Sequence, residues 1–226
     1  MKKFLLIVLF SLFFTNASAN DATIRARALN APNNVATSTH KLAKYLTKPY
    51  KDDYDKLKVI AYWIASHIAY DEYKFKDGKE NHKEMSYQYD ILKMRAGICS
   101  DFARLFMDMA NASGVRGVEA VDGYVLENQH NLKKQYKKRD MPEYGHAWNK
   151  VKLDKRSFYV DTTFMANGAI SPSRQYASSL RHKLDLKQNA RQHNVNENID
   201  DFFFDFTPKQ EVKQYNMVHV RYKYIK

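Results

Sequence analysis

Residues 95 to 106 read Arg95-Ala96-Gly97-Ile98-Cys99-Ser100-Asp101-Phe102-Ala103-Arg104-Leu105-Phe106, and they contain the only cysteine of the 226-residue chain. After Cys99 the apolar residues Phe102, Phe106 and Met109 recur at helical spacing, which predicts a helix with one buried face. Gly97 interrupts a shorter helix predicted around residues 87–94, and Gly114 supplies the left-handed residue at which the longer helix ends. The cysteine is therefore predicted to lie at the start of a helix.

A cysteine at the start of a helix has a specific chemical advantage. The unpaired N–H groups of the first turn and the positive end of the helix dipole stabilise a thiolate. A chain with one cysteine cannot form an internal disulfide, so Cys99 is either a buried inert thiol or a reactive one. A reactive thiol needs a histidine to exchange protons with it, and a carboxylate or amide to orient that histidine.

Two predicted strands downstream supply a candidate for each partner. Period-two alternation predicts a strand over 118–125, then a hairpin of strands 146–153 and 158–164 joined by a turn at 154–157. His146 opens the first hairpin strand and Asp161 lies in the second, on the same face. In that register Asp161 lies opposite Lys150, about 13 Å along the strand from His146, so contact requires strong twist, a bulge or a shifted register. Alone, His146 also fits an ordinary strand histidine, and Asp161 a cap of the Thr162-Thr163 turn.

The other elements place helices before strands. A helix is expected from Ser38 or Thr39 to Pro49, and a second one, capped by Asp53, carries an apolar stripe with Trp63 on its flank. An apolar run at 202–206 and a closing strand over 218–225 follow the hairpin. Helices first and strands afterwards indicate an α+β fold rather than a doubly wound sheet.

The N-terminus has the pattern of a signal peptide. Lys2 and Lys3 precede an apolar stretch at 4–14, and Ala17-Ser18-Ala19 matches a cleavage site. An N-terminal membrane anchor is the alternative. We expect removal of 1–19 by cleavage near Ala19, a periplasmic or secreted protein without a transmembrane segment, a loosely held segment over 20–36 and one domain over 37–226.

The charge is strongly basic, at +12, and removal of Lys2 and Lys3 leaves +10. An exported protein meets little nucleic acid, so anionic envelope lipids or wall polymers are the expected partners, although solubility alone also explains the charge. The most basic segment is a predicted loop just before His146, with Lys133, Lys134, Lys137, Lys138 and Arg139. The histidines show no ligand spacing, so we predict no metal site and no cofactor.

Three segments together resemble the transglutaminase-like superfamily. The stretch at 95–106 followed by Gly114-Val115 resembles its nucleophile segment, His146-Ala147-Trp148-Asn149-Lys150-Val151 its histidine segment, and Phe158-Tyr159-Val160-Asp161-Thr162-Thr163-Phe164 its aspartate segment. The stretch at 62–71 resembles the helix that precedes the nucleophile, and the segment at 202–220 resembles the tail of bacterial and kyphoscoliosis-peptidase-like members. The resemblance covers most of residues 54–220, in the right order.

The resemblance implies a papain-like α+β fold, with the cysteine helix packed on an antiparallel sheet. It implies amide chemistry through a thioester, with Cys99 as nucleophile, His146 as general base and acid, and Asp161 as orienting group. A peptidase or amidase acting on a protein or peptide is expected first, and an acyltransferase second. The alternative is a non-catalytic module that binds anionic envelope polymers or a protein partner.

The oxyanion donors are not identified by the resemblance. Papain-type enzymes place a glutamine shortly before the cysteine, where this chain has Lys93 and Met94, and no tryptophan lies between positions 63 and 148. The Cys99 backbone N–H is one candidate donor. The second is open among Tyr87, Gln88 and Tyr89.

Overall fold

The computed structural model describes residues 20–71, 87–125, 145–154, 156–167, 195–207 and 217–219, with only the backbone described at 87–90, 124–125 and 217–219. The predicted signal peptide, the basic loop at 133–139 and the last part of the predicted closing strand lie outside these residues. The predictions made for them therefore stay predictions.

The described chain runs from helices to strands. The helices are α1 (Asp21–Leu29), η1 (Asn33–Val35), α2 (Thr39–Thr47), α3 (Asp53–His67), α5 (Tyr87–Met94), α6 (Cys99–Ala112), α7 (Thr162–Met165) and η5 (Asp201–Phe203). The strands are β1 (Ala69–Tyr70), β2 (Ala96–Gly97), β3 (Val118–Val125), β4 (His146–Leu153), β5 (Arg156–Val160), β6 (Phe204–Phe206) and β7 (Met217–His219).

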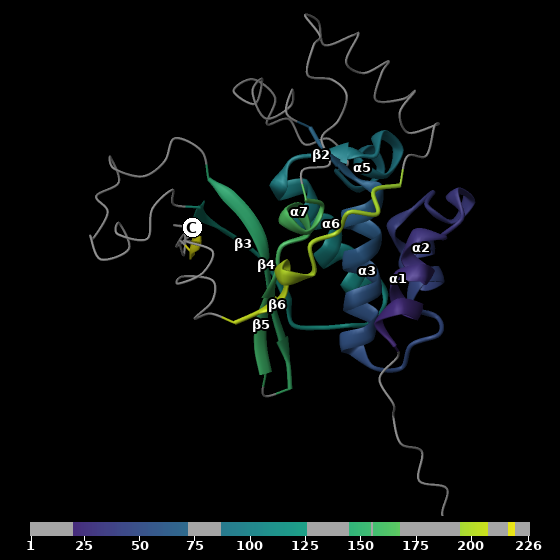
Figure 1. Ribbon diagram of the computed structural model, residues 1–226, viewed down its shortest axis with the longest axis horizontal. Coiled ribbons are helices and arrows are strands. Elements are labelled where there is room, and N and C mark those ends of the chain that lie inside the picture. Colours follow the sequence, from purple (N-terminus) through teal and green to yellow (C-terminus); the bar gives the residue numbers. More distant parts are fainter. Residues whose placement is uncertain are drawn as a thin grey trace, which may run out of the picture.

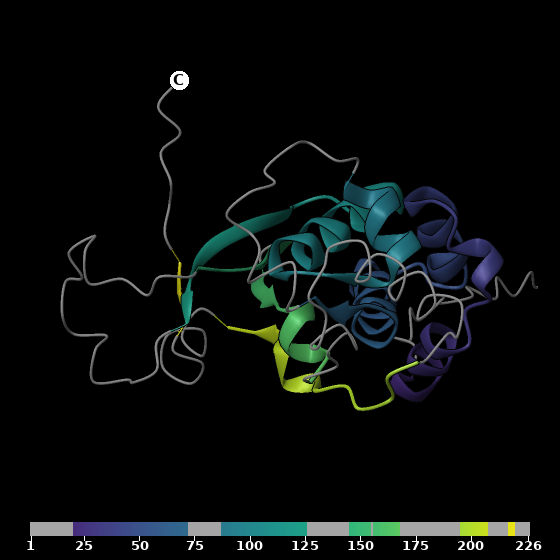
Figure 2. The same ribbon diagram turned by 90° about the horizontal axis from the view of Figure 1, so that it is seen from above.

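The sheet that supports the site has five antiparallel strands in the order β6-β5-β4-β3-β7. Helix α6 packs on β3 and β4, and α2 and α3 pack against α6 in turn, so the helices lie to one side of the sheet (Figure 1). The end of β3 that pairs with β7 extends away from these helices (Figure 2). The α+β architecture, with the cysteine helix on an antiparallel sheet, agrees with the prediction.

The segment expected to be loosely held is instead partly a packed helix. Asn20 caps α1 by accepting a hydrogen bond from the Ala22 N–H at 2.8 Å. Ile24 and Ala28, one helical turn apart, have no exposed surface and belong to the core, and α1 packs on α3. The expectation for 20–36 was wrong over this helix, because its apolar residues are mostly alanines and give only a weak hydrophobic pattern in the sequence.

Helix α3 begins at its predicted position but with a different cap. Asp52, not Asp53, accepts hydrogen bonds from the N–H groups of Tyr54 at 2.8 Å and Asp55 at 3.4 Å. Asp53 is the first residue of the helix and forms an ion pair with Lys56. Trp63 is 1% exposed, as expected for a core residue.

The hairpin turn between β4 and β5 is shorter than predicted. Leu153 pairs with Arg156, so only two positions separate the paired residues, rather than the four at 154–157. Asp154 has a φ of 48°, as tight two-residue hairpin turns require. The second strand also ends earlier, at Val160, because helix α7 begins at Thr162. The shorter turn moves β5 by two residues along β4.

Candidate active site

Cys99 is the first residue of α6, directly after a two-residue strand. Strand β2 pairs in parallel with β1, with Gly97 opposite Tyr70, and leads into the helix through Ile98. The Asp101 carboxylate accepts a hydrogen bond from the Ile98 N–H at 2.9 Å, which fixes the first turn. The predicted position of the cysteine at a helix N-terminus is therefore present in the structure.

Gly97 is required by the close approach of that first turn. A Cβ at this position would lie 2.8 Å from the Cβ of Asp101 and 3.0 Å from a methyl group of Ile91. Only glycine lets the strand lie this close to the residue that caps Ile98. Gly97 thus allows strand β2 to pack against the first turn of α6, which begins at Cys99.

The thiol lies at the junction between helix and sheet. Cys99 is 7% exposed and packs with Ala103 of α6, Ala147 of β4 and the partly buried Tyr70 of β1. The small alanine side chains allow α6 to lie close to β4 at this point. Cys99 is therefore buried, but in contact with the strand that begins at His146.

His146 and Asp161 form a short hydrogen bond. The His146 Nε2 lies 2.6 Å from an Asp161 carboxylate oxygen, and the Asp161 side chain has no exposed surface. The other carboxylate oxygen accepts hydrogen bonds from the N–H groups of Thr163 and Phe164, each at 3.0 Å, and so caps α7. The contact with His146 and the cap of α7 therefore do not exclude each other, because each carboxylate oxygen has its own partners.

The shifted register explains how Asp161 reaches His146. Asn149 pairs with Val160, so Asp161, one residue further, lies at the level of Trp148 rather than opposite Lys150. Trp148 is two residues from His146 on the same face, about 7 Å along the strand, which two side chains span. The gap predicted from the four-residue turn was an error in turn length.

The surroundings of His146 favour its charged form. Burial of the imidazole lowers its pKa, but the negative charge and hydrogen bond of Asp161 and the interaction with Cys99 raise the pKa more, to about 10. Because Nε2 faces Asp161, Nδ1 is the ring nitrogen left for the thiol. The arrangement suits a thiolate–imidazolium pair.

Two aromatic rings stack on the imidazole. Phe164 lies 4.5 Å from it between ring centroids at an interplanar angle of 16°, and Trp148 lies at 5.7 Å and 23°. The His146 side chain is only 10% exposed. Phe164 was not predicted to belong to the site, although its place three residues after Asp161 is a signal that could have put it beside the histidine.

Asn149 of β4 was likewise not predicted to belong to the site. It is fully buried on β4 and donates from Nδ2 to the Ala103 carbonyl of α6 at 2.9 Å. A polar residue within an apolar strand pattern was the available signal, since a buried amide needs a partner. Asn149 ties the strand that begins at His146 to the helix that begins at Cys99.

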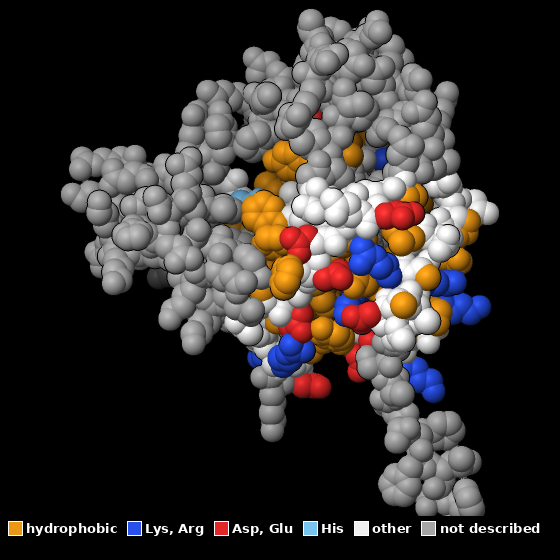
Figure 3. Space-filling model, viewed as in Figure 1, with side chains coloured by type: hydrophobic (Ala, Val, Ile, Leu, Met, Phe, Trp, Pro, Cys, Tyr) orange, Lys and Arg blue, Asp and Glu red, His pale blue; other side chains and the backbone are white. Residues whose placement is uncertain are grey.

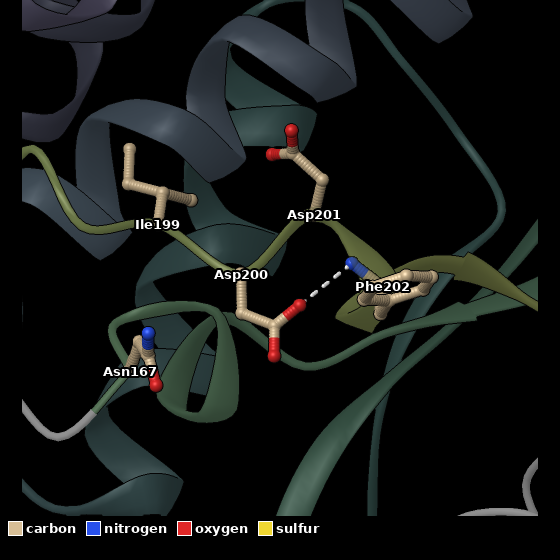
Figure 4. A pocket seen from close by; sticks show the side chains of 5 residues that line it. All are labelled: Asn167, Ile199, Asp200, Asp201 and Phe202. Atoms are coloured by element: carbon tan, nitrogen blue, oxygen red, sulfur yellow. Dashed lines mark hydrogen bonds between the residues drawn. The ribbon is translucent and has the colours of Figure 1, made fainter.

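A pocket of about 570 Å³ lies beside α7 and η5, lined by Asn167, Ile199, Asp200, Asp201 and Phe202. Figure 4 shows the Asp200 carboxylate turned back to accept from the Phe202 N–H, at 3.0 Å. None of the lining residues belongs to the group formed by Cys99, His146 and Asp161. This pocket is therefore separate from that group.

Several other predictions can be compared with the described residues. The side chains of Tyr87, Gln88 and Tyr89, the candidates for the second oxyanion donor, lie outside the part of the chain that the structure describes. No cluster of three metal-ligating side chains occurs in the part of the chain that the structure describes. Within that same part, no helix is both long enough and apolar enough to cross a membrane.

A cysteine at a helix start beside a histidine–aspartate pair on an antiparallel sheet is the site expected of a transglutaminase-like domain. The chain belongs to this superfamily, since the family model "Transglutaminase-like superfamily" matches residues 40–162. This range covers Cys99, His146 and Asp161.

Curated relatives and a solved structure were also found. Kyphoscoliosis peptidase of Mus musculus is 28% identical over 130 residues, which are 58% of this chain and 18% of that protein. The Homo sapiens protein of the same name is 28% identical over 124 residues, which are 55% of this chain and 18% of that protein. The chain thus matches less than a fifth of their length. A solved structure titled "Crystal structure of a TGase" is similar over 74% of this chain and 38% of its own, with 17% identity and a TM-score of 0.35.

Proposed function

We propose that the protein is an exported cysteine enzyme that acts on amide bonds through a Cys99 thioester, as a peptidase or amidase. The observation that carries the proposal is the 2.6 Å contact between His146 and the buried Asp161, on a ring that also interacts with Cys99. The proposal is supported by the residue types, since a thiol, an imidazole and a carboxylate are what the three roles require.

In the proposed reaction the Cys99 thiolate attacks the carbonyl carbon of an amide. The resulting oxyanion is stabilised at the start of α6, where the Cys99 N–H is a donor. His146 gives its proton to the leaving amine as the C–N bond breaks, and a thioester remains. His146 then takes a proton from water, whose oxygen attacks the thioester, and the carboxylic acid leaves as the thiolate is restored.

Acyl transfer differs only in the second step, where an amine replaces water. The two curated relatives are named peptidases, which favours hydrolysis of a polypeptide. Because this chain matches only 18% of their length, we carry their peptidase activity over to this chain only as a proposal.

Cleavage near Ala19 is the proposed route to the mature protein. Helix α1 is capped by Asn20, so this cleavage would leave the described helix and its cap intact. N-terminal sequencing of the protein recovered from the periplasm or medium tests this. A chain that still begins at Met1 would contradict it.

The activity is tested with purified mature protein and two readouts. Release of new amino groups from an unfolded protein measures hydrolysis, and incorporation of a fluorescent amine measures transfer. Cys99→Ala is expected to abolish both, at least 1000-fold, because a covalent nucleophile has no substitute. Ser100→Ala, at the exposed next position of the same helix, is the matched control and should retain activity.

The non-catalytic alternative makes the opposite prediction. If Cys99 reacts with iodoacetamide no faster than a free thiol at neutral pH, and Cys99→Ala leaves the cellular phenotype intact, the enzyme proposal fails. A binding module would instead lose its attachment to anionic polymers when Lys133, Lys134, Lys137 and Lys138 are replaced.

A further inference from the structure

We infer that Phe164 is a positioning residue for His146, whose ring holds the imidazole toward Cys99 and favours its protonated form. This inference rests on the proposed function, because it concerns the thiolate–imidazolium pair. Phe164 does not need to touch substrate or the reacting atoms for this role.

The geometry is that of a parallel stack. The Phe164 ring lies 4.5 Å from the imidazole between centroids and is tilted by 16°. Phe164 is itself held from two sides: its N–H donates to Asp161 at 3.0 Å, and its ring meets the Phe203 ring edge-on at 5.1 Å and 64°. One carboxylate therefore fixes both the imidazole and the ring stacked on it.

The electrostatics point the same way. The face of an aromatic ring carries partial negative charge, so a stacked imidazolium is stabilised relative to a neutral imidazole. Among the described residues, the titratable groups that act on His146 are Asp161 at the start of α7 and Cys99 of α6, while β3 places Gly123 opposite it. Trp148 and Phe164 carry no formal charge, so they act on the charge of His146 only through the partial negative charge of their ring faces.

The position of Phe164 also limits water around the imidazole. Phe164 is partly buried and hydrophobic side chains gather over α7 and η5 (Figure 3). A hydrogen bond between charged groups is stronger where water is excluded. The His146–Asp161 contact benefits from this shielding.

The test uses the full mature protein and needs no substrate. Nuclear magnetic resonance of ¹⁵N-histidine-labelled protein, assigned with His146→Ala, gives the pKa of His146. The rate of Cys99 alkylation by iodoacetamide from pH 4 to pH 10 gives the range over which the thiolate persists. Phe164→Leu keeps apolar volume without an aromatic face, Phe164→Tyr keeps the face, and Phe202→Leu is a control at an exposed phenylalanine of η5, 73% accessible.

We expect Phe164→Leu to lower the pKa of His146 by about one pH unit, from the typical strength of a cation–π contact. Phe164→Tyr should restore the wild-type pKa and Phe202→Leu should not change it. If the leucine variant does not fold, Phe164→Met is measured with the same expectation.

The outcomes separate this inference from the proposed function. A wild-type Cys99 with the alkylation profile of a free thiol would overturn the proposed function. A wild-type protein with a thiolate at low pH, and a leucine or methionine variant with an unchanged His146 pKa, would overturn only the inference about Phe164. A tyrosine variant that behaves like leucine would also overturn it.

Discussion

Asp161 has two sets of partners at once. One oxygen lies 2.6 Å from His146, and the other accepts the N–H groups of Thr163 and Phe164 that begin α7. The Asp161 N–H donates to the Phe203 carbonyl at 2.9 Å, which fixes its backbone as well. A carboxylate held at this many points has little freedom to turn, so its contact with the imidazole has a fixed direction.

Replacement of Asp161 by asparagine separates its charge from its capping role. Asparagine also caps helices well, so α7 should persist, while the pKa of His146 should fall because the largest attraction for its proton is gone. We expect a loss of Cys99-dependent activity of 100-fold or more, as general acid–base catalysis contributes about that much. Activity and the ¹⁵N-histidine titration measure the two effects, and an unchanged titration would contradict the assignment.

The raised pKa of His146 also predicts that the free energy of unfolding depends on pH. The pKa of His146 is raised in the folded protein from 6.5 to about 10, so protonated His146 stabilises the fold fully below pH 6.5. This contribution is lost as pH rises toward 10. Urea unfolding of wild type and Asp161→Asn should therefore differ most at pH 6 and least at pH 10. Parallel pH curves for the two proteins would refute the coupling.

At the level of elements, the site depends on how α6 lies on β4. Asn149 joins them through its hydrogen bond to Ala103, and the small side chains of Ala103 and Ala147 bring the helix close to the strand beside Cys99. The helix supplies the thiol and the strand supplies the histidine. Their relative position is therefore set by buried contacts within four residues of Cys99 and His146 in the sequence.

Asn149→Ala should weaken this junction. Loss of a buried hydrogen bond should lower the free energy of unfolding by about 1–3 kcal/mol, and the rate of Cys99 alkylation should change as helix and strand separate. Lys152→Ala, at an exposed position of the same strand, is the control and should leave both unchanged. If both substitutions change the unfolding free energy and the alkylation equally, the Asn149 hydrogen bond does not hold α6 against β4.

At the scale of the molecule, the helical layer begins earlier than the sequence suggested. Helix α1 packs on α3 through Ile24 and Ala28, and α3 packs on α6. Lys58 of α3 adds an ion pair with Asp21 at 2.7 Å. The support of the cysteine helix therefore extends back to the first described helix.

Ile24→Ala tests whether α1 is part of the folded domain. Removal of a fully buried isoleucine should cost about 2–5 kcal/mol, whereas Ala26→Ser at an exposed position of the same helix should stay within about 0.5 kcal/mol. Denaturant unfolding measures both. An Ile24→Ala protein as stable as wild type would restore the expectation of a loosely held segment.

Most of the fold and the members of the site were predictable because their signals are local. The helical stripe after Cys99 and the alternation after His146 identify α6 and β4, and α5 begins and ends where it was predicted. The order of the three segments indicated which residues should come together.

The pairing of His146 with Asp161 was not predictable from these patterns. Alternation has a period of two, so it is unchanged when a strand shifts by two residues, and it cannot distinguish a two-residue turn from a four-residue turn. Only the paired strands show that Asp154 takes a positive φ in the shorter turn. The stack of Phe164 on the imidazole and the burial of Ile24 likewise depend on partners distant in the chain. The sequence thus determined which residues are candidates for the site, because their types and segment order are local, and the folded packing determined how they meet.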